Sequence, residues 1–256
     1  MSVNWNAKSF NASNAEMLGK AADLVYENNT TVAKTAKAWN MKLIKSFKHK
    51  DTQAYIIGDD ETVILAFRGT EITKVKDITA DLDARLIRGL GGKVHEGFSR
   101  ALSFVWDDLW NTLKAERGSR TLWVTGHSLG GALATLAVAR LRQQKRQSVN
   151  GLYTFGSPRV GNKNFAEKFD QDFKRYTFRF VNDNDAVPHV PSEDMNFSHI
   201  GTRKKFDKKG RLDNKKKKKS LIKKIKKTVK DTVTADQLRD HQMSNYLKNL
   251  KKLANS

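Results

Sequence analysis

Residues 122–141 read Leu122-Trp-Val-Thr-Gly-His-Ser-Leu-Gly-Gly-Ala-Leu-Ala-Thr-Leu-Ala-Val-Ala-Arg-Leu141. The opening apolar residues predict a buried strand, and the run rich in Ala and Leu predicts a helix directly after it. Gly126, Ser128 and Gly130 stand at the junction and fit the pattern G-x-S-x-G. A turn tight enough to lift a serine hydroxyl above the sheet has no room for flanking side chains, so glycine is required there. The junction therefore predicts a nucleophilic Ser128, with an ordinary glycine-bearing helix start as the alternative.

The predicted helix begins directly after Ser128. Backbone N–H groups in the first turn of a helix have no partner within the helix and attract negative charge. The N–H of Leu129 is therefore a candidate donor to the oxyanion that forms when a serine attacks a carbonyl group. His127 lies beside the nucleophile, and we interpret it as a packing residue.

A serine nucleophile needs a histidine base and a carboxylate that orients the base. When the serine stands at a strand-to-helix turn, the acid and then the histidine follow it in the chain. Asp183 and Asp185 stand in a polar loop after a predicted strand, where functional residues commonly lie. Three histidines follow the serine: His189, His199 and His241.

Apolar spacing along the rest of the chain predicts the other elements. The helices are expected near residues 15–26, 33–47 and 98–115. The strands are expected at residues 54–57, 63–67, 152–155 and 176–181, with the turn Gly58-Asp-Asp60 between the first two. Strand, helix and strand in succession imply parallel pairing through right-handed crossovers. We therefore expect an α/β fold whose mixed, mostly parallel sheet is flanked by helices and begins with an antiparallel hairpin.

The 256 residues are enough for one large α/β domain, and we expect residues 1–256 to form it. Apolar residues make up 38% and aromatic residues 9% of the chain, too much core-forming material for a disordered protein. The absence of cysteine excludes disulfides, thiol catalysis and cysteine-based metal sites. The amino terminus lacks the apolar segment of a signal peptide, and no run approaches membrane-spanning length. A soluble, cytoplasmic protein is expected, with signal-independent export as the alternative.

The formal net charge of +21 is concentrated in one segment, since residues 203–230 hold 16 Lys and Arg against two Asp. The apolar residues of 221–233 fall on one helical face, which predicts a cationic amphipathic helix. Two interpretations stay open. Either Lys215 to Lys230 binds an anionic membrane surface, or the apolar face packs beside the site while the lysines stay solvated. Nucleic-acid binding has little support, because no aromatic residue after Phe206 interleaves with the lysines.

Five short segments, taken in order, resemble the class 3, fungal-type lipases. They are Ala66-Phe-Arg-Gly-Thr70, Val94-His-Glu-Gly-Phe98, Phe155-Gly-Ser-Pro-Arg-Val-Gly161, Arg179-Phe-Val-Asn-Asp-Asn-Asp-Ala-Val-Pro188 and Asp240-His-Gln-Met-Ser-Asn-Tyr246. The last is similar to the carboxy-terminal histidine motif of bacterial members. The joint order is specific, and the likeness covers most of the chain from about residue 15. The resemblance implies an α/β-hydrolase fold with a helical lid.

The resemblance also assigns the catalytic residues. In the family the catalytic acid directly precedes a small apolar pair and a proline, which implies Asp185 and leaves Asp183 as the alternative. His241 is implied as the base. Thr70 is implied to donate its backbone N–H to the oxyanion hole together with Leu129.

The family's lid, a helix over the acyl groove, corresponds to residues Glu71 to Gly92. Val75, Ile78 and Leu82 recur at helical spacing and are the candidates to face the groove. An ordinary surface helix is the alternative, because this segment is rather polar. A helical insertion before the histidine, residues 203–233, carries the basic charge.

The implied activity is hydrolysis of lipid esters, triacylglycerol or related compounds, by a Ser-His-Asp acyl-enzyme mechanism without a metal or a cofactor. His95 and His199 have no step in that mechanism, and we interpret them as structural residues. One alternative is a phospholipase A1 that the basic segment recruits to anionic membranes. An alternative of another class is a polyanion- or membrane-binding module with a degenerate hydrolase fold, which the intact Ser, Asp and His positions disfavour.

Overall fold

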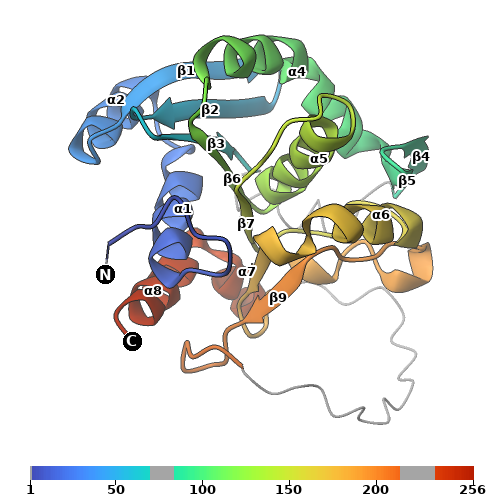
Figure 1. Cartoon of the computed structure of the whole chain (residues 1–256). Coiled ribbons are helices and arrows are strands. Elements are labelled where there is room, and N and C mark those ends of the chain that lie inside the picture. Colours follow the sequence, from blue (N-terminus) through green and yellow to red (C-terminus); the bar gives the residue numbers. More distant parts are fainter. Residues whose placement is uncertain (1, 70–83, 214–233) are drawn as a thin grey trace.

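A seven-stranded mixed sheet runs through the part of the protein that the computed structural model describes, which is residues 2–69, 84–213 and 234–256. The strand order is β1-β2-β3-β6-β7-β8-β9 (Figure 1). The strands are β1 (Lys42–His49), β2 (Thr52–Gly58), β3 (Thr62–Phe67), β6 (Thr121–His127), β7 (Gly151–Phe155), β8 (Thr177–Val181) and β9 (Thr202–Lys205). From β3 to β9 the pairing is parallel, whereas β1, β2 and β3 are antiparallel. The predicted mostly parallel sheet with an antiparallel entry is confirmed.

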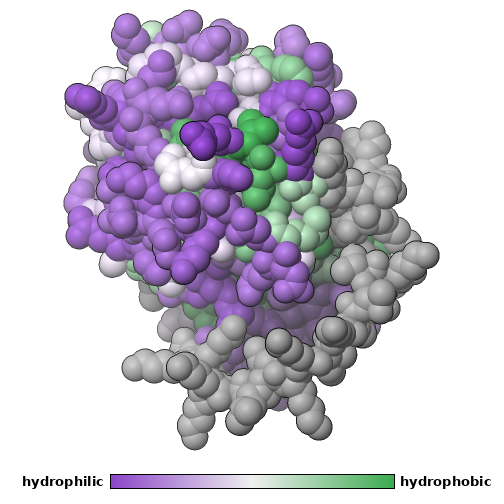
Figure 2. Space-filling model, turned by 90° about the vertical axis from the view of Figure 1, so that its right-hand side faces the viewer, coloured by the Kyte–Doolittle hydropathy of each residue, from purple (hydrophilic) through white to green (hydrophobic). Residues whose placement is uncertain are grey.

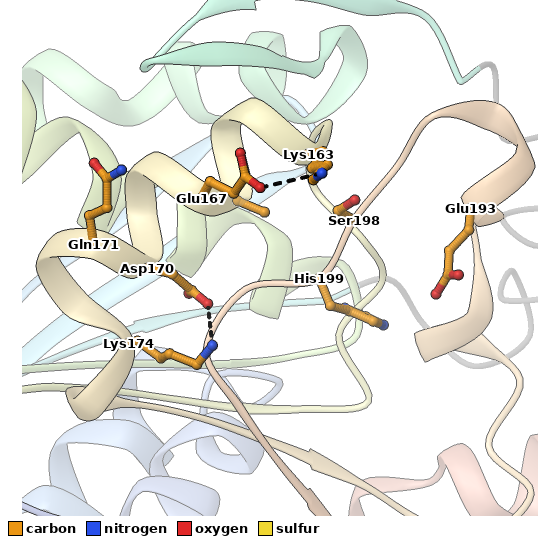
Figure 3. Close-up of a pocket in the computed structure, with 9 residues that line it drawn as sticks. Lys163, Glu167, Asp170, Gln171, Lys174, Glu193, Ser198 and His199 are labelled. Carbon is orange, nitrogen blue, oxygen red and sulfur yellow. Dashed lines mark ion pairs between the residues drawn. The ribbon is translucent and has the colours of Figure 1, made fainter. Parts of the chain in front are cut away.

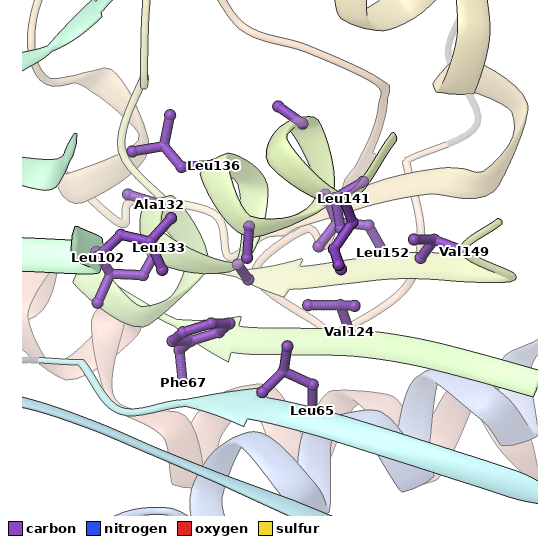
Figure 4. Close-up of a cluster of buried hydrophobic side chains, with 14 of the residues drawn as sticks. Leu65, Phe67, Leu102, Val124, Ala132, Leu133, Leu136, Leu141, Val149 and Leu152 are labelled. Carbon is purple, nitrogen blue, oxygen red and sulfur yellow. The ribbon is translucent and has the colours of Figure 1, made fainter. Parts of the chain in front are cut away.

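Strand side chains alternate between two cores, one on each face of the sheet. Leu65 and Phe67 of β3 face one core, which Figure 4 shows, and Ile64 and Ala66 face the other. The first core is covered by α4 (Glu96–Glu116), α5 (Leu129–Gln143) and α6 (Lys163–Phe173). The second is covered by α1 (Ala12–Leu24), α2 (Asn29–Ala38) and α8 (Met243–Ala254). The alternation fixes the strand register, because a shift of one residue would send each side chain to the wrong core.

One predicted helix, residues 33–47, is wrong in its second half. The helix α2 ends at Ala38, Asn40 adopts a left-handed conformation with φ 58°, and β1 follows. Leu43 and Phe47 are four residues apart, which suggested a helical face. In the structure a β-bulge between Leu43 and Lys45 turns Leu43 toward one core and Phe47 toward the other. Pairing with β2 along the sheet edge therefore overrides the local pattern.

Two predicted segment boundaries are also wrong. Residues 84–92 were placed in the helical lid, but they include β4 (Leu86–Gly89), which pairs with β5 (Gly92–His95) in a separate two-stranded sheet. The basic helical insertion was placed from residue 203, but residues 203–205 belong to β9, the last parallel strand. The strand was not predicted because its residues are mostly charged and show no apolar alternation. The remainder of both segments, residues 70–83 and 214–233, lies outside the described residues.

The face that carries α6 and the β4–β5 sheet is largely hydrophilic, with one hydrophobic patch near its centre (Figure 2). No helix in the described ranges is long and apolar enough to cross a membrane. The short α7 (Ala235–His241) precedes α8, and the described residues also include the 3-10 helices η2 (Lys174–Tyr176), η3 (Val187–His189) and η4 (Glu193–Met195).

Candidate active site

Ser128 stands where β6 ends and α5 begins. Its backbone has φ 55° and ψ −130°, a conformation that costs about 1–3 kcal/mol for a residue with a side chain. The side chain is fully buried, and its Oγ has no hydrogen-bond partner in the described part of the chain. Strain and an unpaired buried hydroxyl are typical of a nucleophile held in place by its surroundings.

Glycines on both sides of Ser128 allow the neighbouring backbones to approach it. A Cβ on Gly130 would collide with the carbonyl oxygen of Phe67, at the end of β3. A Cβ on Gly69 would lie 2.5 Å from the carbonyl oxygen of His127 and 3.1 Å from the Cβ of Ser128. A Cβ on Gly126 would collide with the carbonyl oxygen of Gly130 within the turn itself. The sequence indicated this tight turn, but not the contact between Gly130 and the end of β3.

The oxyanion donors are described only in part. Leu129 is the first residue of α5, where a backbone N–H has no acceptor within the helix. Thr70 lies outside the described residues, although Gly69 before it lies against Ser128. The lid candidates Val75, Ile78 and Leu82 also lie outside the described residues, and their position stays a prediction.

Asp185 and His241 are hydrogen-bonded to each other although 56 residues separate them. His241 Nδ1 donates to Asp185 Oδ2 at 2.9 Å and lies 3.0 Å from Oδ1. Both side chains are buried, with 0% and 1% of their surface exposed. Since the carboxylate accepts the Nδ1 proton, the lone pair of the imidazole is on Nε2, where a base needs it.

Local structure fixes each member of this pair. Asp185 Oδ1 also accepts the backbone N–H of Val187 at 2.9 Å, which folds the loop into the start of η3. His241 is the last residue of α7, whose start is fixed by a capping box between Thr234 and Gln237. The acid and the base are therefore held by short motifs that the chain supplies locally.

Tyr246 is a third partner of the carboxylate, and the sequence pattern did not predict this role. Its hydroxyl donates to Asp185 Oδ2 at 2.6 Å and accepts the backbone N–H of Asn182 at 3.0 Å. Burial raises the pKa of Asp185, but the charge of His241 and the hydrogen bonds from His241, Tyr246 and Val187 outweigh it and hold that pKa below its ordinary value. Asp185 is therefore ionised at neutral pH. The signal was present, because Tyr246 ends the segment that contains His241.

Gly156 allows this pair to form, and it was also missed. Its φ is +58°, and a Cβ there would lie 2.8 Å from both Asp185 Oδ2 and His241 Nδ1. Only glycine leaves room for the imidazole and the carboxylate beside the end of β7. The segment that carries the resemblance, residues 155–161, includes this glycine without indicating why it is needed.

His127 does more than pack beside the nucleophile. Its Nε2 donates to the carbonyl oxygen of His241 at 2.7 Å, and its Nδ1 lies 3.1 Å from the hydroxyl of Tyr26. Burial and the neighbouring His241 lower the pKa of His127 to about 3, so the ring is neutral. A neutral His127 ties the backbone of the base to the serine turn.

The other candidates lie in different surroundings. Asp183 forms an ion pair with Lys205 at 3.5 Å. His199 Nε2 donates to the carbonyl oxygen of Pro188 at 2.7 Å. The ring of His95 caps α4, where its Nδ1 accepts the N–H of Phe98 at 3.3 Å. The structural interpretation of His95 and His199 agrees with these contacts, and neither histidine is hydrogen-bonded to Asp185.

Ser128 Oγ and His241 Nε2 are the atoms between which a proton would move. Both are buried, and neither has a hydrogen-bond partner among the residues described. Hydrogen bonds of this kind are often long in the free enzyme and shorten when substrate binds. The arrangement can therefore perform serine chemistry once the two side chains approach each other.

A surface depression of about 770 Å³ lies beside α6, away from Ser128. Figure 3 shows its charged side chains paired with one another, Lys163 with Glu167 and Asp170 with Lys174. Its acids and bases neutralise each other, so it offers little to a lipid. Within the described ranges, no group of three or more His, Asp or Glu is placed to hold a metal ion.

Comparisons with known proteins agree with this geometry. Residues 64–195 match the family described as Lipase (class 3). A lipase of Rhizopus niveus is 35% identical over 173 residues, which cover 62% of this chain and 43% of that protein. A triacylglycerol lipase of Ricinus communis is 30% identical over 251 residues, covering 71% of this chain and 47% of that protein. The chain thus spans less than half the length of these two relatives.

Solved structures show the same similarity. A crystal structure of a mutant form of MDLA from Penicillium cyclopium has a TM-score of 0.67 at 29% identity, covering 75% of this chain and 78% of that one. A Rhizomucor miehei lipase propeptide complex has a TM-score of 0.66 at 28% identity, covering 83% and 76%. One similar structure is described as a triacylglycerol lipase whose catalytic centre is a serine protease triad.

Proposed function

The chain belongs to the class 3 lipase family, and we propose that it hydrolyses lipid esters, triacylglycerols or related compounds, through an acyl-enzyme formed on Ser128. The observation that carries the proposal is the buried hydrogen bond between His241 Nδ1 and Asp185, with Ser128 on the strained turn beside it. The degenerate binding module is disfavoured, because such a module has no need of a buried acid and base held together.

The mechanism follows from the roles of the three residues. His241 Nε2 accepts the Ser128 proton while Oγ attacks the ester carbonyl carbon, and the backbone N–H groups of Leu129 and Thr70 stabilise the oxyanion. The tetrahedral intermediate then expels the alcohol, which takes the proton from His241. A water molecule, deprotonated by His241, attacks the carbonyl carbon of the acyl-enzyme. The bond to Ser128 Oγ then breaks, Oγ takes the proton back from His241, and the fatty acid is released. Asp185 holds the imidazole orientation and stabilises its positive form in both steps.

The direct test is the hydrolysis of p-nitrophenyl butyrate and of emulsified triacylglycerol by the Ser128→Ala variant. We expect turnover to fall by several orders of magnitude, because the nucleophile is removed. The matched control is Ser103→Ala, which changes an exposed serine of α4 that bonds only its own helix. Circular dichroism would show that both variants fold. Activity that survives in Ser128→Ala at the wild-type level would refute the proposal.

Access to Ser128 requires movement of the residues that cover it. The side chain is fully buried, so covering residues must move before an ester reaches Oγ. The apolar candidates for this cover are Val75, Ile78 and Leu82, which we propose face the acyl chain. A rate that rises steeply once tributyrin exceeds its solubility would support this role, and a rate that follows dissolved substrate alone would count against it.

A second candidate function, phospholipase A1 action at an anionic membrane, is favoured by the charge of residues 203–230. We propose that Lys215 to Lys230 bind such a surface, where each basic residue contributes about 1 kcal/mol. Fatty-acid release from phosphatidylglycerol vesicles and from neutral phosphatidylcholine vesicles would separate the candidates. Replacement of Lys215 to Lys219 by Ser should slow only the reaction on anionic vesicles. Equal rates on both vesicle types would exclude this recruitment.

A further inference from the structure

A second cluster of charged side chains lies on the other side of the loop that carries Asp185. We call this loop, residues 182–189, the acid loop. A cavity of about 410 Å³ is lined by Val181, Pro188 and His189, which flank or belong to the acid loop, and by residues of neighbouring segments. We call it the cationic cavity, because its lining includes four basic side chains: Arg159, Arg179, Arg203 and Lys205.

The strand register places two of these cations side by side. Arg179 of β8 is the direct partner of Arg203 in β9, and Val181 is the partner of Lys205. Phe178 and Phe180 belong to the core under α1 and α8, so alternation turns Arg179 to the opposite face. Like charges directly opposite each other destabilise a sheet unless something neutralises them.

Arg179 is almost completely enclosed. Arg179 exposes 7% of its surface, and its Nε donates to the carbonyl oxygen of Ile200 at 2.5 Å. Burial, and then the charges of Arg203 and Arg159, lower the pKa of Arg179 to about 9. No carboxylate of the described residues forms an ion pair with its guanidinium. A buried guanidinium normally has such a partner.

Arg159 is equally buried and only partly satisfied. One of its terminal nitrogens donates to the carbonyl oxygens of His189 and Pro191, and the other to Glu193 at 3.0 Å. Its Nε has no hydrogen-bond partner in the described residues. Two enclosed guanidinium groups therefore line the same cavity, and neither has a partner in the described residues for all of its N–H groups.

The acids around the cationic cavity do not balance its cations. Glu193 pairs with Arg159, and Asp183 pairs with Lys205. Asp170, the next acid, already pairs with Lys174 at 3.1 Å, as Figure 3 shows. The lining histidines, His189 and His199, both have lowered pKa values because of burial and the nearby arginines, and they are neutral. Four cations facing two carboxylates leave an excess of two positive charges.

We propose that the cationic cavity binds a phosphate group, either the headgroup of a lipid or a free phosphate. A phosphate carries a charge of about −1.5 to −2 at neutral pH, which matches the excess, and its oxygens fit the planar forks of arginine. Bound there, it bridges Arg179 and Arg203 and relieves their repulsion across the two strands. The site is separate from Ser128 and does not depend on the proposed hydrolase activity.

The test is the melting temperature of the full chain in inorganic phosphate, compared with chloride of matched ionic strength. We expect phosphate to raise the melting temperature saturably, because it binds only the folded state. The variant Arg203→Gln should weaken this binding about tenfold, the effect of losing one charged hydrogen bond. Its matched control, Arg100→Gln, changes an exposed arginine of α4 outside the cavity and should retain the wild-type response.

A charge reversal makes the test sharper. The variant Arg203→Glu places a carboxylate opposite Arg179, so we expect it to melt higher than the wild type without phosphate and to lose the response to phosphate. Equal phosphate responses in wild type, Arg203→Gln and Arg203→Glu would place binding elsewhere and overturn the proposal. So would the absence of any specific response in the wild type.

Vesicles identify the source of the phosphate. If the ligand is a lipid headgroup, Arg203→Gln should reduce binding to phosphatidylcholine vesicles that contain phosphatidic acid, while Arg100→Gln should not. If the ligand is free phosphate, both variants should bind those vesicles equally, and only Arg203→Gln should show the weakened response to inorganic phosphate. Because these measurements involve no ester cleavage, their failure is distinct from failure of the proposed hydrolase activity.

Discussion

The two sides of the acid loop differ in how their charges are matched. On the side of Ser128, the carboxylate of Asp185 accepts hydrogen bonds from His241, Tyr246 and the N–H of Val187. On the side of the cationic cavity, four basic side chains face two carboxylates. One loop thus separates a site whose acid is fully satisfied from a site whose cations are not.

This difference shows which kind of ligand each side suits. A neutral ester brings no charge, so the site that cleaves it must contain its own balanced acid and base, oriented before the substrate arrives. On the cavity side, the cations without a carboxylate partner in the described part of the chain are the buried Arg179 and the exposed Arg203. A buried cation without a carboxylate partner is costly until an anion arrives, which is the property of a binding site for anions. The following predictions test that contrast, from the largest expected effect to the smallest.

The largest effect is expected for Asp185→Asn. An amide cannot hold His241 in the required tautomer or stabilise its charged form, so turnover of p-nitrophenyl butyrate should fall by about four orders of magnitude. The control is Asp194→Asn, an exposed acid in η4, which should have nearly wild-type turnover. If Asp183→Asn were the more damaging substitution, the assignment of the acid would be wrong.

The next test adds a side chain at Gly156, at the end of β7, where it would crowd Asp185 and His241. Gly156→Ala places a Cβ 2.8 Å from Asp185 Oδ2 and His241 Nδ1, so the pair must separate. We expect turnover to fall about 100-fold, because a displacement of about 1 Å has that effect. The control is Gly118→Ala, with φ +54° and no atom within 4 Å of the new Cβ. Alanine at either position has a positive φ, which costs about 1–2 kcal/mol. The loss of unfolding free energy that urea denaturation gives for Gly118→Ala therefore measures this strain, and it can be subtracted from the loss measured for Gly156→Ala. Equal loss of activity in both variants would contradict the role of Gly156.

A smaller effect is expected when Tyr246→Phe removes one hydrogen bond to the carboxylate. Asp185 should lose about 1.5–3 kcal/mol of stabilisation of its ionised form, and kcat/KM should fall about tenfold. Because the Tyr246 hydroxyl lowers the pKa of Asp185, its loss should raise that pKa and move the acid limb of the pH–rate profile to higher pH. Tyr176→Phe, in η2, is the matched control. An acid limb that does not move would mean that Tyr246 only packs.

The sequence predicted those features of the fold and the site that depend on short, local motifs. The strand-to-helix turn at Ser128, the antiparallel hairpin and the positions of Asp185 and His241 were all predicted, because glycine patterns and motif order carry them. Tyr246 and Gly156 were not assigned roles, because their importance depends on contacts between segments far apart in the chain. The strand β9 was missed because its residues, Thr-Arg-Lys-Lys, lack the apolar alternation that predicts strands.

The smallest effect is expected on the cavity side, in the dependence of stability on pH. Burial and the charges of Arg179 and Arg159 lower the pKa of His199 from 6.5 to about 2 in the folded protein. Below pH 6.5 the unfolded chain therefore binds a proton that the folded protein does not, and the free energy of unfolding should fall by about 1.4 kcal/mol per pH unit from this residue. His199→Gln removes this contribution, so urea denaturation at several pH values should give a shallower acid dependence.

The same measurement connects His199 to the cationic cavity. A bound phosphate would offset the arginine charges that depress the pKa of His199, so saturating phosphate should make the acid dependence of the wild type shallower and leave that of His199→Gln unchanged. The matched control is His49→Gln, which changes an exposed histidine of β1 and should retain the wild-type slope. If phosphate changed the slope equally in the wild type and in His199→Gln, the anion would bind away from the arginines, and the two sides of the acid loop would not differ in the way described.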